Sequence, residues 1–205
     1  MKKVKLRNKY YEDEKLFSRL NIEIKDGITI LVGCNGTGKT TALKQIEAQL
    51  SHDNIPFVSH SNLENGAKQM RDRAIHVGNY DFVAQVFCSS EGENIVNAMS
   101  QIAMQIGQKC RNNTADEFWV LLDAVDSGLS IDNIIDLKEF LRNTVIAENS
   151  EKTVYILISA NEYELCRGEN CLDVTNGKYI SFNDYEEYRN FIIKSRDKKD
   201  KRYNK

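Results

Sequence analysis

The apolar residues of this chain gather in three short, nearly continuous runs with polar residues or glycines beyond their ends. The runs cover residues 28–32, 118–122 and 154–158. Because apolar and polar positions do not alternate within them, they predict strands that are buried on both faces, as in a parallel sheet.

Other stretches carry apolar residues at the helical spacing of three or four. They cover residues 41–50, 94–109 and 131–147. In the last of these, the residues expected to face the core are Ile134, Ile135, Phe140 and Leu141. A final helix is predicted over 184–194, and the Lys- and Arg-rich tail beyond it, residues 194–205, is expected to fray.

Turn signals predict two hairpins. Residues 21–25 alternate and then meet Asp26-Gly27, so we expect a hairpin that leads into the strand over 28–32. Asn176-Gly177 predicts a second hairpin between 172–175 and 178–182. An edge strand is predicted within 2–11, and the weak pattern over 51–81 predicts a loop with a short helix. Together these elements predict an α/β fold with a mainly parallel sheet, flanking helices and an antiparallel edge.

The segment between the first buried strand and its helix matches the phosphate-binding pattern G-x-x-x-x-G-K-[ST] at residues 33–40. Its glycines let backbone N–H groups turn towards a phosphate, and the helix that follows adds the positive end of its dipole. The lysine can reach the β- and γ-phosphates, and the last threonine can bind Mg²⁺. The sequence therefore predicts a P-loop protein that binds ATP with Mg²⁺. The residues expected to contact the nucleotide are Asn35, Gly36, Thr37, Gly38, Lys39, Thr40 and Thr41.

Composition narrows the class of protein further. The net charge of −2 gives no global basic field for nucleic acid, and no apolar run approaches the ~18 residues of a membrane span. We therefore expect a cytoplasmic protein of one domain, or of one domain with a small insert. The odd number of cysteines and the absence of a C-x-x-C pair indicate reduced thiols. We interpret Cys166 and Cys171 as ordinary structural cysteines rather than as zinc ligands.

Two aspartates follow the second buried strand. Asp123 ends the run over 118–122, where an acidic residue downstream of a P-loop can hold the Mg²⁺ that Thr40 also contacts. The alternative is an aspartate that caps the next turn. Asp126 lies three residues further on.

A third motif, Ser90-x-Gly92-Glu93, opens the helix over 94–109. With the loop before it and Asp123-x-x-Asp126 after it, the chain resembles the ATP-binding-cassette (ABC) ATPases, most closely the heads of SMC and DNA-repair ATPases, over about residues 2–182. The resemblance implies a homodimer around ATP in which Ser90 and Gly92 of one subunit contact the γ-phosphate bound to the other. Taken alone, the motif also fits a plain helix N-cap.

The resemblance leaves two other roles open. Tyr10 or Tyr11 is a candidate for stacking on the adenine, although a core or surface tyrosine is as good an interpretation. Gln69 and Gln85 are both candidates for the metal-sensing glutamine of that family.

The chain departs from the ABC pattern at the positions that matter for hydrolysis. Ala124 stands where the family has a catalytic glutamate, and Ala160 or Asn161 stands in place of a histidine. A carboxylate that orients the attacking water is worth ~10²–10⁴ in rate, so we expect a slow ATPase. The predicted catalytic residues are Lys39, Asp123 and Asp126, the last either as a substitute base or as a dimer-contact residue. The segment between Lys39 and Ser90 is also too short for a coiled-coil arm.

The resulting hypothesis is an ABC-type ATPase domain over 1–183, followed by a C-terminal helix and basic tail over 184–205. It would act as a slow switch in DNA maintenance or in a phage or mobile-element system. The alternatives are the nucleotide-binding subunit of a membrane transporter and a P-loop kinase for a small molecule. The tail is interpreted either as a contact for nucleic acid or an unidentified protein partner, or as a solvated end.

Overall fold

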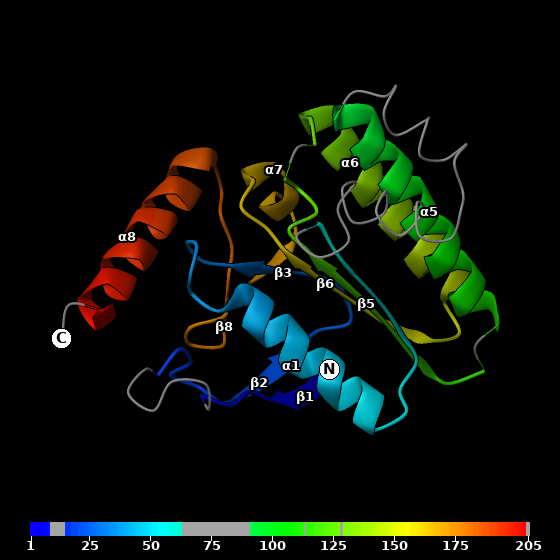
Figure 1. Cartoon of the computed structure of the whole chain (residues 1–205), viewed down its shortest axis with the longest axis horizontal. Helices are drawn as coiled ribbons and strands as arrows, with labels where there is room; N and C mark the ends of the chain where they lie inside the picture. Colours follow the sequence, from blue (N-terminus) through cyan, green and yellow to red (C-terminus); the bar gives the residue numbers. More distant parts are fainter. Residues whose placement is uncertain (9–14, 63–90, 113, 128, 204–205) are drawn as a thin grey trace, which may run out of the picture.

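A computed structural model of the chain describes residues 1–8, 15–62, 91–112, 114–127 and 129–203. Its described part has one large sheet, one small sheet and helices on both faces of the large sheet (Figure 1). The order of strands in the large sheet is β4-β5-β6-β3-β7-β8. These strands are β4 (Phe57–Ser61), β5 (Glu117–Asp123), β6 (Thr153–Ser159), β3 (Gly27–Val32), β7 (Asn170–Asp173) and β8 (Lys178–Ile180).

The pairing of the strands confirms the predicted fold class. All neighbours from β4 to β7 are parallel, and only β8 runs antiparallel to its neighbour, β7. The hairpin predicted at Asn176-Gly177 is therefore present, with Gly177 at a φ of +66° that favours glycine. The chain is an α/β protein with a mainly parallel sheet and an antiparallel edge.

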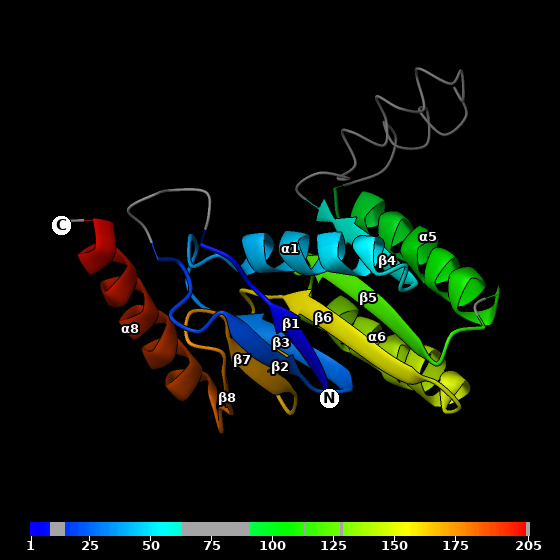
Figure 2. The same ribbon diagram turned by 90° about the horizontal axis from the view of Figure 1, so that it is seen from below.

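The three apolar runs form the centre of this sheet, and each of them contributes side chains to the two hydrophobic cores, one on each face. Ile30 and Val120 point into the core on one face, whereas Leu31 and Leu121 point into the core on the other. Figure 2 shows α1 (Lys39–His52) on one side of the sheet and α6 (Ile131–Phe140) on the other. A strand covered on both faces has no polar face, and this is why the runs lack alternation.

The helices largely follow the predicted ranges. The remaining ones are α5 (Glu91–Asn112), α7 (Tyr163–Cys166) and α8 (Tyr185–Tyr203). A π-helical turn, Leu141–Ile146, and a 3₁₀ turn, Ala147–Asn149, continue α6. Ile134 and Leu141 are buried and Phe140 packs against them, but Ile135 is 40% exposed, so its predicted core position is wrong. The buried face runs through Ile134, Leu137 and Leu141, and Ile135 lies about a third of a turn away from its centre.

The first predicted hairpin is wrong. The strand β2 (Asn21–Ile24) pairs antiparallel with β1 (Lys2–Lys5) in the small sheet and not with β3. The backbone of β3 is already paired with β6 and β7. The side chains of Ile22 and Ile24 are buried with those of α1, so the small sheet covers the same face of the large sheet as this helix. Asp26-Gly27 turns the chain from one sheet into the other.

Two further predictions need correction. The stretch interpreted as loop plus short helix contains the strand β4, which pairs with β5. Its sequence, Phe-Val-Ser-His-Ser, mixes apolar and polar residues and gave no clear strand pattern. The rest of that prediction, from residue 63, lies outside the described residues. The tail expected to fray continues α8 to Tyr203, because Tyr188 and Ser195 are buried and Phe191 packs against the core.

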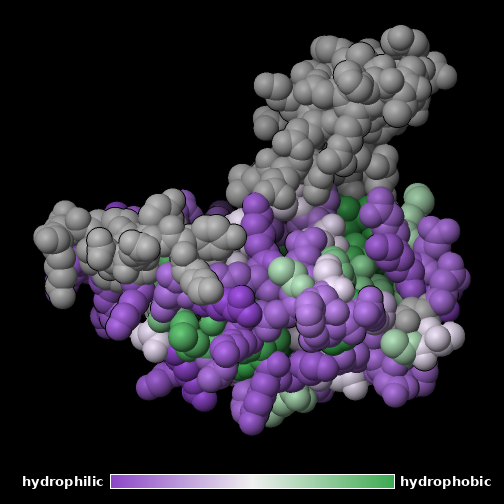
Figure 3. Space-filling view, turned by 60° about the horizontal axis from the view of Figure 1, so that its bottom comes forward, coloured by the Kyte–Doolittle hydropathy of each residue, from purple (hydrophilic) through white to green (hydrophobic). Residues whose placement is uncertain are grey.

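Among the described helices, none is both long and apolar enough to cross a bilayer. The coloured part of the surface in Figure 3 is largely hydrophilic, and its hydrophobic colour is confined to small patches.

Candidate nucleotide-binding site

The loop over 33–40 joins the carboxyl end of β3 to α1, and its glycines are required by its shape. Gly33, Gly36 and Gly38 have φ values of +146°, +82° and +96°. A Cβ on Gly33 would lie 2.6 Å from Oγ1 of Thr37, and one on Gly38 would lie 3.1 Å from the ring of Phe17. Inside the loop, the Thr37 hydroxyl donates to the carbonyl of Cys34 at 2.8 Å. The loop is thus closed by its own side chains and backbone.

Lys39 lies at the centre of the site. Its side chain is buried, and Nζ donates to the carbonyl oxygen of Gly33 at 2.6 Å and to Oδ1 of Asn161 at 3.1 Å. Burial lowers the pKa of Lys39, while the negative charges of the nearby Asp126 and Asp123 act in the opposite direction. The ammonium group therefore connects the phosphate loop to the end of β6.

The carboxylate of Asp123 accepts hydrogen bonds from hydroxyl groups of three neighbouring segments. Thr40 Oγ1 donates to Oδ1 at 3.1 Å, Ser61 Oγ donates to Oδ2 at 3.3 Å, and Ser159 Oγ also donates to Oδ1. These residues meet because the carboxyl ends of parallel strands lie at the same edge of the sheet. Hydroxyl and carboxylate oxygens are the ligands that Mg²⁺ prefers, and it is often bound by only one or two carboxylates. Thr40 and Asp123 are therefore the residues that fit this metal.

Ala124 stands in an unusual conformation directly after Asp123. Its φ is +53°, in the left-handed region that residues other than glycine rarely adopt. Two hydrogen bonds hold it there: its N–H donates to Ser159 Oγ at 2.9 Å, and its carbonyl accepts from Asn62 Nδ2 at 3.0 Å. The residue in the position of the family's glutamate is fixed from both sides but carries only a methyl group.

Asp126 supports the segment that follows β6. Its side chain is buried, and Oδ2 accepts from the backbone N–H of Asn161 at 2.5 Å and of Glu162 at 2.8 Å. The other oxygen, Oδ1, has no hydrogen-bond partner among the described residues. Of the two candidates for the switch position, Ala160 is buried in the core and Asn161 is the one whose side chain meets Lys39.

The remaining predicted residues are placed less fully. Asn35 and Gly36 are exposed on the loop, and Thr41 is half-buried in the first turn of α1. Gly92 lies in the first turn of α5. The candidates outside the described residues are Tyr10, Tyr11, Gln69, Gln85 and Ser90.

Sequence reasoning missed the polar residues that end β4 and β6. Ser61 forms a hydrogen bond with Asp123, and Asn62 forms one with Ala124. Ser159 forms hydrogen bonds with both Asp123 and Ala124. The available signal was weak for Ser61, because its strand was not predicted. Ser159 directly follows a predicted strand and could have been noticed.

A phosphate-binding loop, a buried lysine and a hydroxyl–carboxylate pair at the edge of an α/β sheet define this chain as a P-loop ATP-binding ATPase. A family model described as "AAA domain" matches residues 23–164, and the chain belongs to this family. The matched segment contains Lys39, Asp123 and Asn161 but ends before β7, β8 and α8. No curated protein gives a significant match to the chain.

Proposed function

We propose that this chain is a slow ATPase of the ABC type that dimerises around ATP and acts as an ATP-dependent switch. The observation that carries the proposal is Ala124, a methyl group held next to Asp123 by two hydrogen bonds. Binding of ATP and its rapid hydrolysis place different demands on a site, and the described residues meet mainly the demands of binding.

Binding of the triphosphate is supported by the loop and by Lys39. The ammonium group is already within 2.6 Å of Gly33 O, so it needs only to exchange carbonyl and amide acceptors for phosphate oxygens. Charge-assisted hydrogen bonds of this kind are about twice as strong as neutral ones. Bound Mg²⁺ would supply charge neutralisation for the β- and γ-phosphates. Thr40 and Asp123 would hold it, and the Ser61 and Ser159 hydroxyls fix the orientation of the Asp123 carboxylate.

Slow hydrolysis is supported by the two positions after β5. Ala124 offers neither a base nor an acceptor to an attacking water. Asp126 is the next carboxylate along the chain, but one of its oxygens is engaged by the backbone N–H groups of Asn161 and Glu162. Its geometry therefore favours a supporting role over that of a base.

Dimerisation around ATP is supported by the order of the motifs and by the exposure of Asn35 and Gly36 on the loop. A second subunit could approach the phosphates at these residues, with Ser90 and Gly92 of that subunit completing an anion site at a helix N-terminus. The resemblance to DNA-repair ATPase heads favours a role in DNA maintenance or in a phage or mobile-element system.

The test is steady-state phosphate release by the wild type, Ala124→Glu and Asp126→Ala, with Lys39→Ala as the background control. We expect slow release by the wild type and an increase of about tenfold or more for Ala124→Glu, because a carboxylate is restored at a fixed backbone position. A fast wild type that loses its activity only in Asp126→Ala would contradict the proposal and make Asp126 the base. Light scattering with and without ATP tests the dimer: an unchanged mass at high protein concentration would exclude it.

A further inference from the structure

The C-terminal helix α8 lies against the candidate site although it is outside the family match. Ser195 is buried, and its Oγ accepts a hydrogen bond from the backbone N–H of Cys34 at 3.2 Å. Cδ of Lys199 lies 3.4 Å from where a Cβ on Gly36 would stand. Tyr188 donates from its hydroxyl to the carbonyl of Asn161 at 2.6 Å. The helix thus touches the phosphate loop at two residues and the end of β6 at a third.

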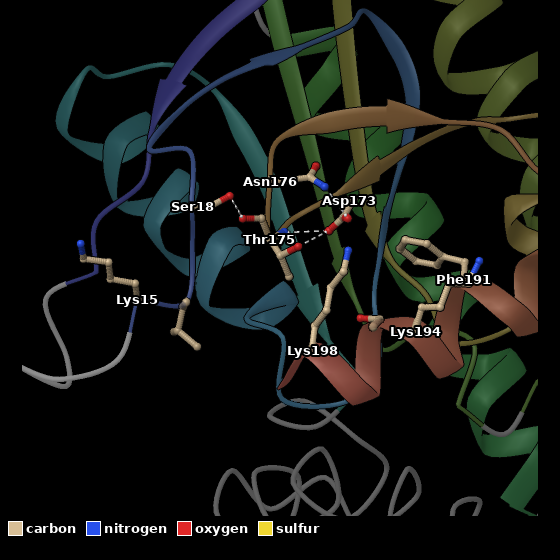
Figure 4. A pocket seen from close by; sticks show the side chains of 10 residues that line it. Lys15, Ser18, Asp173, Thr175, Asn176, Phe191, Lys194 and Lys198 are labelled. Carbon is tan, nitrogen blue, oxygen red and sulfur yellow. Dashed lines mark hydrogen bonds between the residues drawn. The ribbon is translucent and has the colours of Figure 1, made fainter. Parts of the chain in front are cut away.

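A cavity of about 390 Å³ lies between α8, the segment over 15–18 and the turn after β7 (Figure 4). Phe191, Lys194 and Lys198 line it at the helical spacing of one face. The cavity adjoins the phosphate loop at two points. Ser195, which also lines it, bonds to Cys34, and Cβ of Leu16 lies 3.8 Å from where a Cβ on Gly38 would stand.

The lining of the cavity combines positive charge with apolar surface. Lys15, Lys194 and Lys198 line it together with one acidic residue, Asp173. The oxygens of Asp173 accept hydrogen bonds from Thr175 and Asn176 in the turn, so its carboxylate is used to hold that turn. In Figure 4 the side chain of Lys198 points across the cavity towards the turn.

This combination suits an anion that carries a flat apolar group. Leu16 and Phe191 supply apolar wall, and the lysines supply cations that bind phosphate oxygens through charge-assisted hydrogen bonds. The volume lies within the range of small-molecule pockets. A nucleotide whose β- and γ-phosphates lie in the loop would place its nucleoside beside the loop, and this cavity adjoins the loop.

We propose that α8 is part of the nucleotide site, with the cavity holding the nucleoside and Lys194 and Lys198 binding the phosphate next to it. The inference rests on the ATP binding in the proposed function and is independent of hydrolysis and dimerisation. Under this assignment the basic segment near the C-terminus binds the nucleotide of its own chain and is not a solvated tail.

The test compares Lys194→Ala/Lys198→Ala with Arg196→Ala, which removes a cation from the same helix but not from the lining of the cavity. Calorimetric titration with MgATP should give an affinity about tenfold or more lower for the double variant and unchanged for Arg196→Ala. Inorganic tripolyphosphate, which has no nucleoside, should bind the wild type more weakly than ATP does. Equal affinities for ATP and tripolyphosphate would contradict a nucleoside in the cavity.

Other outcomes separate this inference from the proposed function. If Lys39→Ala loses ATP binding and the double variant keeps wild-type affinity, the role of α8 is excluded and the ATP site stands. If the wild type does not bind ATP, both fail. If the double variant keeps its ATP affinity and loses binding to a single-stranded oligonucleotide, Lys194 and Lys198 bind nucleic acid in the wild type. That outcome would overturn the inference.

A footprint on the wild-type protein covers the case of a double variant that does not fold. Acetylation of lysines by acetic anhydride, with and without MgATP, is measured residue by residue by mass spectrometry. We expect ATP to protect Lys194 and Lys198 and to leave the exposed Lys201 unchanged. Equal acetylation of Lys194 and Lys198 with and without ATP would overturn the inference.

Discussion

Asp126 and Asn161 are joined by a hydrogen bond in which Oδ2 of the aspartate accepts from the backbone N–H of the asparagine at 2.5 Å. The side chain of the same asparagine accepts from Nζ of Lys39 at 3.1 Å, and its carbonyl accepts from Tyr188. All three contacts come from different segments of the chain. Asn161 is therefore held through its backbone and presents its amide to the lysine that is predicted to bind phosphate.

Asp126→Ala should lower stability as well as misplace Asn161. It leaves two backbone N–H groups without their acceptor, and each costs about 1–3 kcal/mol if it stays buried. We expect a loss of that order in the free energy of unfolding, measured by urea denaturation, and a smaller loss for Asp126→Asn, which keeps an oxygen acceptor. Unchanged stability with abolished phosphate release would instead indicate a catalytic carboxylate.

Ala124→Gly should stabilise the protein. A left-handed conformation costs a residue with a Cβ about 1–2 kcal/mol, and glycine adopts it without that cost but with a larger loss of backbone entropy. The net gain should be about 0.5–1 kcal/mol in the free energy of unfolding. Ala160→Gly is the matched control, because Ala160 is buried and has no positive φ; it should destabilise. A destabilised Ala124→Gly would show that the methyl group makes contacts that matter.

Gly33→Ala should destroy the phosphate loop. The new Cβ would lie 2.6 Å from Thr37 Oγ1, a side chain that is itself bonded to Cys34. ATP binding measured by calorimetry should be lost. Gly27→Ala provides the control, because Gly27 also has a positive φ of +78° but nothing lies within 4 Å of its Cβ position. It should keep ATP binding and lose only about 1 kcal/mol of stability.

Lys39→Ala should abolish or greatly weaken ATP binding, because it removes the cation that is predicted to face the β- and γ-phosphates. Lys39 is buried and forms hydrogen bonds with Gly33 and Asn161, unlike a solvent-exposed lysine. We therefore also expect a loss of about 1 kcal/mol in the free energy of unfolding. Lys44→Ala, an exposed lysine of the same helix, should bind ATP as the wild type does. Unchanged calorimetric affinity in Lys39→Ala would contradict the site.

His60 should make the stability depend on pH. Its pKa is lowered by burial, although a hydrogen bond to Asn62 acts in the opposite direction. The unfolded chain, with a histidine pKa near ~6.5, therefore takes up a proton more readily than the folded chain, and stability falls as the pH falls below that value. In urea denaturation at a series of pH values, His60→Gln should show a shallower loss between about pH 7 and 5. The same slope in both proteins would contradict this.

The central strands of the sheet and the local part of the site could be predicted from the sequence. Strands that are covered on both faces need continuous apolar residues, so β3, β5 and β6 could be recognised in the sequence as apolar runs. The phosphate loop was also visible, because its glycines serve a conformation that neighbouring residues define. Asp123 was found from its position after a buried strand. The hairpin of β7 and β8 followed from Asn176-Gly177, since two residues suffice to specify such a turn.

The pairing of distant segments and the contacts between their side chains could not be predicted from the sequence, because they depend on the tertiary structure. The strand β2 has the pattern of a hairpin partner for β3, but β3 is paired on both sides by segments distant in sequence. The alternation in β4 is too weak to predict a strand, and its pairing with β5 is what brings Ser61 to Asp123. The tail beyond residue 194 has the composition of a solvated end. Instead it is the end of α8, and Ser195 in it accepts a hydrogen bond from the backbone N–H of Cys34; a contact across that sequence separation leaves no local signal.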